Sequence, residues 1–160
     1  MSLKDEIKQV KPFQSLKEQT LVNVIYTNNW IYFKQNKFFK PYDISVQQYN
    51  VLRILNGQHG KPITINDIID SMLDKMSNAS RLVDKLVLKG YVERSQKPDN
   101  RRACDVVISK SGKLALEKIS KQQLELENHL GELSDTEFEE LNRLLDKLRK
   151  VISVKYSQAV

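Results

Sequence analysis

The sequence predicts a mainly α-helical chain with one small β-hairpin. Three observations support this prediction. Apolar residues recur at helical spacing through most of the 160 residues. Three segments that begin with serine have the form of a helix capping box. Two short strand-forming runs, YVER at 91–94 and CDVVI at 104–108, flank a Pro-Asp-Asn turn at residues 98–100.

Composition is that of a folded domain: 40% of residues are hydrophobic and 29% are charged. No apolar run approaches the roughly 18 residues that a membrane span requires. The N-terminal residues MSLKDEIKQVK lack the apolar core of a signal peptide. The only cysteine, Cys104, has no partner for an intramolecular disulfide. We therefore expect a cytoplasmic protein.

A long first helix is predicted over roughly residues 15–39. Ser15 and Glu18 form the capping box at its start, and Pro41 cannot continue it. The helix is rich in aromatic side chains, which are Tyr26, Trp30, Tyr32, Phe33, Phe38 and Phe39. Core packing is the more common role of such residues.

Two shorter helices are predicted next. Ser45–Gln48 is a second capping box, and its helix runs for about three turns. Residues 62–65 can form a short strand. Thr64 or Asn66 can then cap a helix that continues to Met72.

A fourth helix is predicted from Ser77 until Gly90 stops it. Its apolar residues follow i, i+3, i+4, i+7, i+8 spacing and predict one buried stripe. They are Ala79, Leu82, Val83, Leu86 and Val87. The opposite side of the helix is polar.

The hairpin strands are predicted at residues 91–94 and 104–108. Ser109 can cap the next helix, which begins near Ser111 and runs to about His129. A third capping box, Ser134–Glu137, opens the last helix. The apolar residues of that helix are Phe138, Leu141, Leu144, Leu145, Leu148, Val151 and Ile152.

Positive charge gathers between Lys75 and Arg102. This stretch has eight basic and three acidic residues, a net charge of +5, whereas the whole chain carries +6. A helix and a hairpin tip that share a positive field suit a polyanion, and DNA is the leading candidate.

A short helix, a tight connection and a second helix form a helix-turn-helix, whose second helix enters the major groove while the hairpin acts as a wing. Arginine and asparagine can make two-point contacts with guanine and adenine, and serine can contact bases or phosphate. Lys85, one turn further along the helix, suits a phosphate contact. Taken alone, this lysine would suggest only a solvated helix surface. The candidate DNA-binding residues are Ser77, Asn78, Ser80, Arg81, Lys85, Lys97, Arg101 and Arg102.

Asp99 is acidic at the tip of this basic hairpin. It either shapes the wing by accepting hydrogen bonds from Arg101 or from turn amides, or serves as a plain turn former. Both interpretations remain open.

Catalytic and metal-binding motifs are not evident. His59 and His129 have no zinc-ligand spacing, and the sequence contains neither a glycine-rich phosphate loop nor a nucleophile elbow. We therefore expect no enzyme, cofactor, metal site or catalytic residue. Cys104 suits a small buried hydrophobic role, with a thiol switch as the alternative.

Three consecutive motifs carry a resemblance to a known family. They are Gly90-Tyr-Val-Glu-Arg94, Asp99-Asn-Arg-Arg-Ala103 and Val106-Val-Ile-Ser109-Lys-Ser-Gly112. This order resembles the MarR family of winged-helix transcriptional regulators. In that family the wing has a D-x-R-x-A core and the strand ends in Leu-Thr-x-x-Gly, for which this chain has Ile-Ser-x-x-Gly. The motif-level similarity covers residues 44–112.

The resemblance implies a winged helix-turn-helix DNA-binding domain at residues 41–110, flanked by helical dimerisation regions at 1–40 and 111–160. It also implies a homodimer on a pseudo-palindromic operator, a repressor role, and control by a small aromatic or phenolic effector. Tyr26, Trp30 or Phe33 of the first helix could line the effector pocket, with core packing as the alternative. The expected interface residues are Leu144, Leu145, Leu148, Val151 and Ile152. Packing of these residues within one chain is the alternative to a dimer. A winged helix that binds protein instead of DNA is the alternative function.

Overall fold

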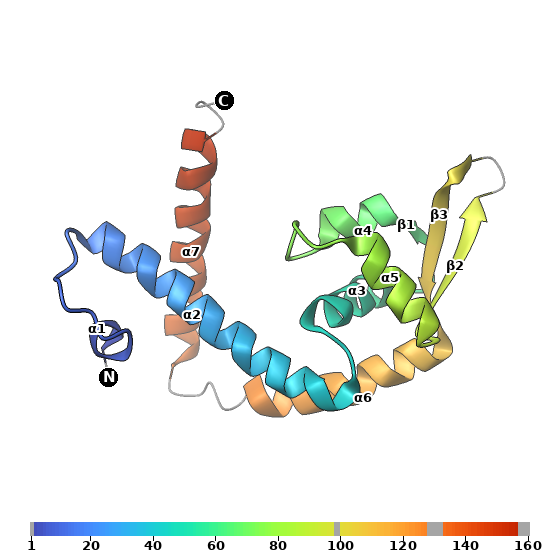
Figure 1. Cartoon of the computed structure of the whole chain (residues 1–160), viewed down its shortest axis with the longest axis horizontal. Helices are drawn as coiled ribbons and strands as arrows, with labels where there is room; N and C mark the ends of the chain where they lie inside the picture. Colours follow the sequence, from blue (N-terminus) through green and yellow to red (C-terminus); the bar gives the residue numbers. More distant parts are fainter. Residues whose placement is uncertain (1, 98–99, 128–132, 157–160) are drawn as a thin grey trace. The chain divides into compact units, whose positions relative to one another are not determined.

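The computed structural model describes the backbone of residues 2–97, 100–127 and 133–156, and the side chains of residues 2–96, 104–123 and 133–150. Contacts between residues divide the chain into two compact units, Met1–Leu116 and Glu117–Val160. Figure 1 follows the helices and strands along the chain.

The predicted fold class is confirmed: the chain is mainly helical, with one small antiparallel sheet. Its elements are α1 (Leu3–Glu6), α2 (Leu16–Phe39), the 3₁₀ helix η1 (Lys40–Tyr42), α3 (Val46–Asn56), β1 (Ile63–Thr64), α4 (Ile65–Ser71), α5 (Ala79–Leu88), β2 (Val92–Lys97), β3 (Asn100–Ile108), α6 (Lys110–Glu127) and α7 (Asp135–Tyr156). The short helix α1 was not expected from the sequence.

Local capping sets the helix starts as predicted. The side chain of Ser15 accepts a hydrogen bond from the Glu18 amide, 3.1 Å away, and α2 ends at Phe39, before the proline. Ser45 and Gln48 form a complete capping box on α3. Of the two candidate caps for α4, the structure uses Thr64, whose hydroxyl accepts from an amide 3.2 Å away.

Helix α5 begins later than predicted. It starts at Ala79, while Asn78 is its N-cap residue and Ser77 lies in the preceding turn. The side-chain oxygen of Asn78 accepts from the Arg81 amide at 3.0 Å. Because asparagine caps a helix better than it continues one, the cap displaces the start by two residues.

The apolar stripe of α5 is narrower than the sequence pattern predicts. Ala79, Val83 and Leu86 are buried and Leu82 is half-buried, but the side chain of Val87 is 37% exposed. The inclusion of Val87 in the buried stripe was therefore wrong. Helix α5 packs against α3, α4 and β2, and this contact covers less of its surface than five apolar positions span.

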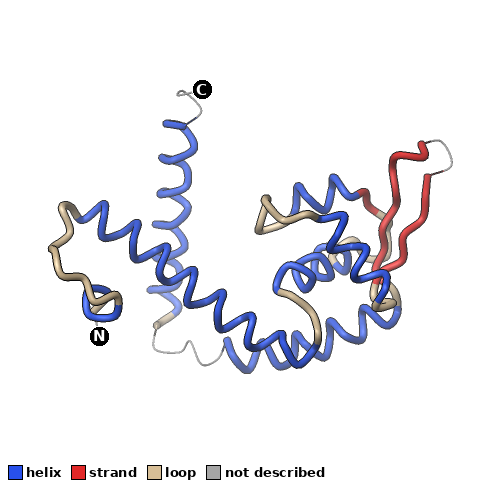
Figure 2. The backbone as a smooth tube through the Cα atoms, in the orientation of Figure 1, coloured by secondary structure: helices blue, strands red, loops and turns tan. Residues whose placement is uncertain are grey.

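The three strands have the order β1-β3-β2 and are antiparallel. Strands β2 and β3 pair from Val92 with Ile108 to Gln96 with Cys104, and the register shifts after Gln96. Strand β1 covers only Asp105 and Val106 of β3, so the outer part of the hairpin is two-stranded (Figure 2). Both strands run further than predicted because their outer residues are polar, which hides the apolar alternation of a strand.

One core joins the elements of the first unit. Its largest fully buried side chains come from the end of α2 and from α3, α4, α5, β2 and β3. They are Phe39, Val51, Leu52, Leu55, Ile68, Val83, Leu86, Val92 and Val106. This core fixes α5 and the hairpin to the same support.

The junction between the sheet and α6 depends on close backbone packing. The Ser109 hydroxyl donates to the Gly90 carbonyl oxygen at 2.6 Å and accepts from the Gly112 amide at 3.0 Å, which caps α6 as predicted. A β-carbon on Gly112 would collide with the carbonyl oxygen of Tyr91 and lie 2.9 Å from Cγ1 of Ile108. Only glycine therefore fits this position without movement of the backbone.

In the second unit, Ser134 and Glu137 form the predicted capping box of α7. The Ser134 amide donates to the Glu137 carboxylate at 2.8 Å, and the Glu137 amide lies 3.4 Å from the Ser134 hydroxyl. These hydrogen bonds hold the pKa of Glu137 below its ordinary value. None of the described side chains of α7, at 135–150, is fully buried.

Candidate nucleic-acid interface

The predicted base-reading residues lie at the start of α5 and in the turn before it. Ser77 and Ser80 are half-buried, whereas Asn78 and Arg81 are exposed. The Ser77 hydroxyl donates to a carboxylate oxygen of Asp74 at 2.7 Å. With its oxygen engaged as the helix cap, Asn78 offers chiefly its amide hydrogens to a ligand.

Arg81 and Lys85 present charge that no described side chain neutralises. They lie one helical turn apart on α5 and are exposed. Within the part of the chain that the structure describes, neither makes a hydrogen bond or an ion pair through its side chain. Both are therefore available to a polyanion.

Three other basic residues of the cluster are engaged by the protein itself. The Lys89 Nζ atom lies 2.6 Å from a carboxylate oxygen of Asp43. Lys75 donates from Nζ to the Ile69 carbonyl oxygen at 3.1 Å. Asp43 lies outside the basic segment and therefore offsets one unit of its +5 charge, whereas the carbonyl contact of Lys75 orients that side chain and leaves its charge.

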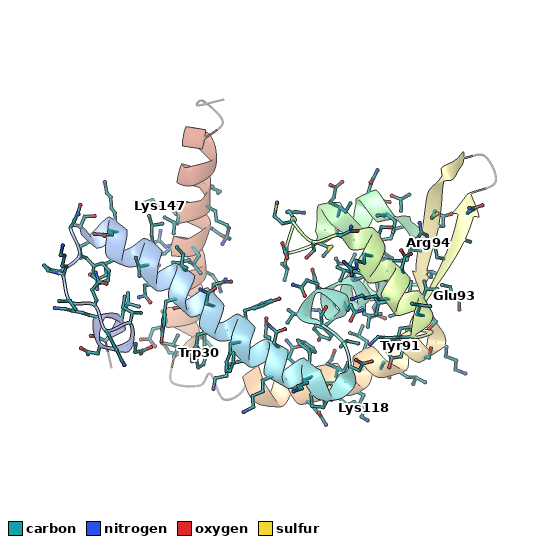
Figure 3. All side chains as sticks on the ribbon, viewed as in Figure 1. Trp30, Tyr91, Glu93, Arg94, Lys118 and Lys147 are labelled. Atoms are coloured by element: carbon teal, nitrogen blue, oxygen red, sulfur yellow. The ribbon has the colours of Figure 1, made fainter. Side chains whose placement is uncertain are left out.

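The third engaged cation, Arg94, ties the wing to α5. It lies on β2 (Figure 3), and its Nη1 atom is 2.5 Å from a carboxylate oxygen of Asp84 on α5. A hydrogen bond with Cys104, and secondarily Asp84, raises the pKa of Arg94 above its ordinary value. Cys104 is half-buried, so it is less enclosed than a small core hydrophobe would be.

The predicted wing residues are only partly described. Lys97 ends β2, and Arg101 and Arg102 lie on β3, but their side chains are outside the described set. Asp99 lies outside the described residues altogether. The roles assigned to these four residues stay predictions.

The predicted interface residues lie on α7. Leu144 is 47% exposed, and Leu145 and Leu148 are half-buried. The side chains of Val151 and Ile152 are outside the described set. Their contribution to a dimer interface stays a prediction.

A shallow polar hollow of about 610 Å³ lies where α2, α3 and α5 approach one another. Its lining includes three lysines, which are Lys40, Lys85 and Lys89. The aromatic residues Tyr26, Trp30 and Phe33, considered from the sequence as pocket residues, do not line it. No local pattern in the sequence indicates this hollow, because its lysines come from separate segments.

No cluster of three or more potential metal ligands occurs among the residues that the structure describes. Within the same residues, no helix has both the length and the apolar character that a membrane crossing requires.

The helix order, the antiparallel wing and the two unpaired cations on α5 define a winged helix-turn-helix protein. Residues 44–104 match the model of the MarR family. The transcriptional regulator BilQ of Clostridioides difficile is 27% identical over 116 residues, which cover 72% of this chain and 77% of that relative.

Solved structures agree with this assignment. A MarR transcription factor from Planctomyces limnophilus is 29% identical, with a TM-score of 0.66, covering 84% of this chain and 98% of that one. The C80S mutant of MarR from E. coli, complexed with operator DNA, has the same fold: its TM-score is 0.64 at 24% identity, over 92% of this chain and 99% of that one.

Over residues 44–104 the chain matches the MarR family, and its fold is that of the winged helix-turn-helix transcriptional regulators of that family. It is a DNA-binding regulator, and the family is one of transcriptional regulators and not of enzymes.

Proposed function

We propose that the chain is a repressor that binds a pseudo-palindromic operator as a homodimer and releases it when a small aromatic acid binds. The pair of unneutralised cations on α5, Arg81 and Lys85, carries the DNA-binding part of this proposal. Ser77, Asn78, Ser80 and Arg81 read base edges, and Lys85 contacts phosphate. Lys97, Arg101 and Arg102 on the wing contact the backbone or the minor groove.

Uncovered apolar surface supports the homodimer. Four large side chains of α2 are between 46% and 68% exposed, namely Leu21, Ile25, Trp30 and Phe33. On α7, Leu141 and Leu144 are 45% and 47% exposed. A second copy of the chain would cover such surfaces. Residues 1–40 and 111–160 are accordingly the proposed dimerisation regions, and 41–110 the proposed DNA-binding domain.

A two-fold dimer places its two recognition helices on half-sites about 10 base pairs, or a multiple of that, apart. The operator is therefore expected to be an inverted repeat. Repression follows simply from this geometry, because a dimer on such a site excludes other proteins from the same stretch of duplex.

The lysine-lined hollow supports control by an effector that carries an acid group. Asp43 also lines the hollow and pairs with Lys89. Lys40 and Lys85 therefore supply its unpaired positive charge among the described residues. Since Lys85 also belongs to the proposed DNA contact, an anion held there would compete with DNA phosphate for it. Lys40→Ala is expected to reduce release by aromatic acids such as salicylate while leaving DNA affinity without effector unchanged.

The deciding experiment is a selection of genomic fragments by the full-length protein at moderate salt. The expected result is enrichment of an inverted repeat, bound with an affinity that falls steeply as salt rises, by a slope of about −0.9 per phosphate contact. Selection of no preferred sequence would contradict the proposal.

Competition by heparin and nonspecific DNA addresses the alternative function, a winged helix that binds protein. A DNA-binding protein is displaced from labelled duplex by both competitors. Indifference to both would favour the protein-binding alternative, against which the exposed cations of α5 already argue.

Oligomeric state is tested separately by sedimentation. Leu144→Asp is expected to shift the protein from dimer to monomer, because it places a charge on the proposed interface. Lys147→Ala, on the same helix, is the matched control and is expected to remain dimeric. A wild-type protein that sediments as a monomer at micromolar concentration would refute the dimer.

A further inference from the structure

The turn between α4 and α5 exposes two large apolar side chains. Leu73 is 89% exposed and Met76 is 94% exposed. Single exposed apolar residues need no explanation, but these two share one short turn directly before the recognition helix. Met76 lies two residues before the N-cap of α5.

Asp74 fixes the conformation of this turn. One of its carboxylate oxygens accepts from the Met76 amide at 3.0 Å, and the other accepts from the Ser77 hydroxyl at 2.7 Å. The Ser77 hydroxyl first, and then the Met76 amide, hold the pKa of Asp74 below its ordinary value. The carboxylate therefore stays charged near neutral pH and keeps both hydrogen bonds.

Two further contacts anchor the turn to neighbouring helices. The Leu73 amide donates to the side-chain oxygen of Asn50 on α3 at 3.0 Å. Lys75 donates to the Ile69 carbonyl oxygen at the end of α4. The exposed side chains thus project from a backbone that is already ordered, which lowers the entropy lost when they meet a partner.

The surroundings of these side chains favour DNA over protein as the partner. Arg81 and Lys85 are exposed on the adjoining helix, and the N-terminus of α5 adds partial positive charge. A stable protein interface buries about 800 Å² on each partner, far more than two side chains supply. In the major groove, by contrast, the thymine C5-methyl group is a small apolar target on the base edges.

We propose that Met76, with Leu73 beside it, packs against thymine methyl groups in the major groove. This inference rests on the proposed function, because it requires the start of α5 to enter the groove. According to this proposal, DNA bases are recognised by the turn before α5 as well as by the polar residues of α5. The unbranched, polarisable methionine side chain is suited to such a contact.

The test uses the full-length protein and the operator obtained by selection. Each thymine of a half-site is replaced in turn by deoxyuridine, which lacks only the methyl group. At one or two positions we expect binding to weaken about four-fold, the effect of one buried methyl group. Met76→Ala is expected to bind the thymine and uracil duplexes equally well at those positions.

Leu88→Ala is the matched control, because Leu88 is 87% exposed at the opposite end of α5. This variant is expected to keep the full preference for thymine. Asp74→Ala should reduce the preference without abolishing folding, since Asp74 positions Met76 and does not touch the base. The melting temperature of each variant identifies any general loss of structure.

Two outcomes would overturn the inference. Wild-type protein that binds its operator equally well with uracil at every position makes no methyl contact. Met76→Ala protein that keeps the four-fold preference at every such position shows that Met76 makes no methyl contact. Failure to select any operator would instead refute the proposed function, and this inference with it.

Discussion

Helices α5 and α2 use their apolar residues in different ways. Helix α5 has 10 residues and buries three of them, Ala79, Val83 and Leu86. Helix α2 has 24 residues and buries only Phe39, although it carries many large apolar side chains. The region around α5, which we propose reads DNA, completes its core within one chain, whereas α2 leaves apolar surface that a partner would cover. Stability and assembly should therefore respond to different substitutions.

The largest expected effect lies in the core beneath α5. Leu52 is fully buried, and Leu52→Ala should lower the free energy of unfolding by about 2–5 kcal/mol, because it leaves a cavity. Leu21→Ala on α2 removes a side chain that is 46% exposed and serves as the control. Urea denaturation at a protein concentration where only monomer is present should show the difference. An equal loss of unfolding free energy in both variants would show that α2 and the core beneath α5 contribute alike to stability.

Gly112→Ala, at the junction between the sheet and α6, should lower the free energy of unfolding by about 3 kcal/mol, since the new methyl group would collide with the Tyr91 carbonyl oxygen. Gly57→Ala is the matched control, because the nearest atoms there lie at 3.4 Å or more, an ordinary contact distance. Thermal unfolding measures both. A Gly112→Ala protein that melts with wild type would show that α6 can shift away from the sheet.

Arg81→Ala should cost about 1–3 kcal/mol of operator affinity and relax base preference at one position. Arg102→Ala should weaken binding more evenly across sequences, because a wing arginine contacts the backbone or a narrow groove. Fluorescence anisotropy against a panel of single-base operator variants separates the two patterns. Uniform weakening by Arg81→Ala would assign that side chain to phosphate and not to a base.

The smallest effect is expected from the ion pair that joins the wing to α5. The side chains of Arg94 and Asp84 are 31% and 56% exposed, so Asp84→Ala should change stability by less than about 1 kcal/mol. The difference from wild type should shrink in high salt. A larger loss of stability that does not depend on salt would show that the ion pair contributes more to the wing than an exposed pair normally does.

Features that depend on a few neighbouring residues, such as helix caps, were predicted correctly from the sequence. Ser15, Ser45 and Ser134 each cap the helix expected of them, because a capping interaction spans only three residues. The start of α5 was misplaced by two residues, since both Ser77 and Asn78 can cap a helix and only the fold selects between them. The spacing of Asp74 and Ser77, three residues apart, indicates a turn before α5, because the Asp74 carboxylate accepts a hydrogen bond from the Ser77 hydroxyl.

Contacts between distant segments could not be predicted in this way. Lys89 pairs with Asp43, 46 residues away, and Arg94 pairs with Asp84 across the boundary between helix and sheet. The exposure of Val87 likewise depends on how far α3, α4 and β2 extend over α5. No periodicity within one segment contains this information.

Capping, apolar spacing and charge are local properties of the chain, so the sequence alone predicts the helices, the hairpin and a basic segment suited to DNA. Which cations of that segment remain available depends on the fold. Folding brings carboxylates and carbonyl groups against Lys75, Lys89 and Arg94, and leaves Arg81 and Lys85 without an ion pair among the residues that the structure describes. The same folding fixes the turn that presents Met76, because its hydrogen bonds join neighbouring helices.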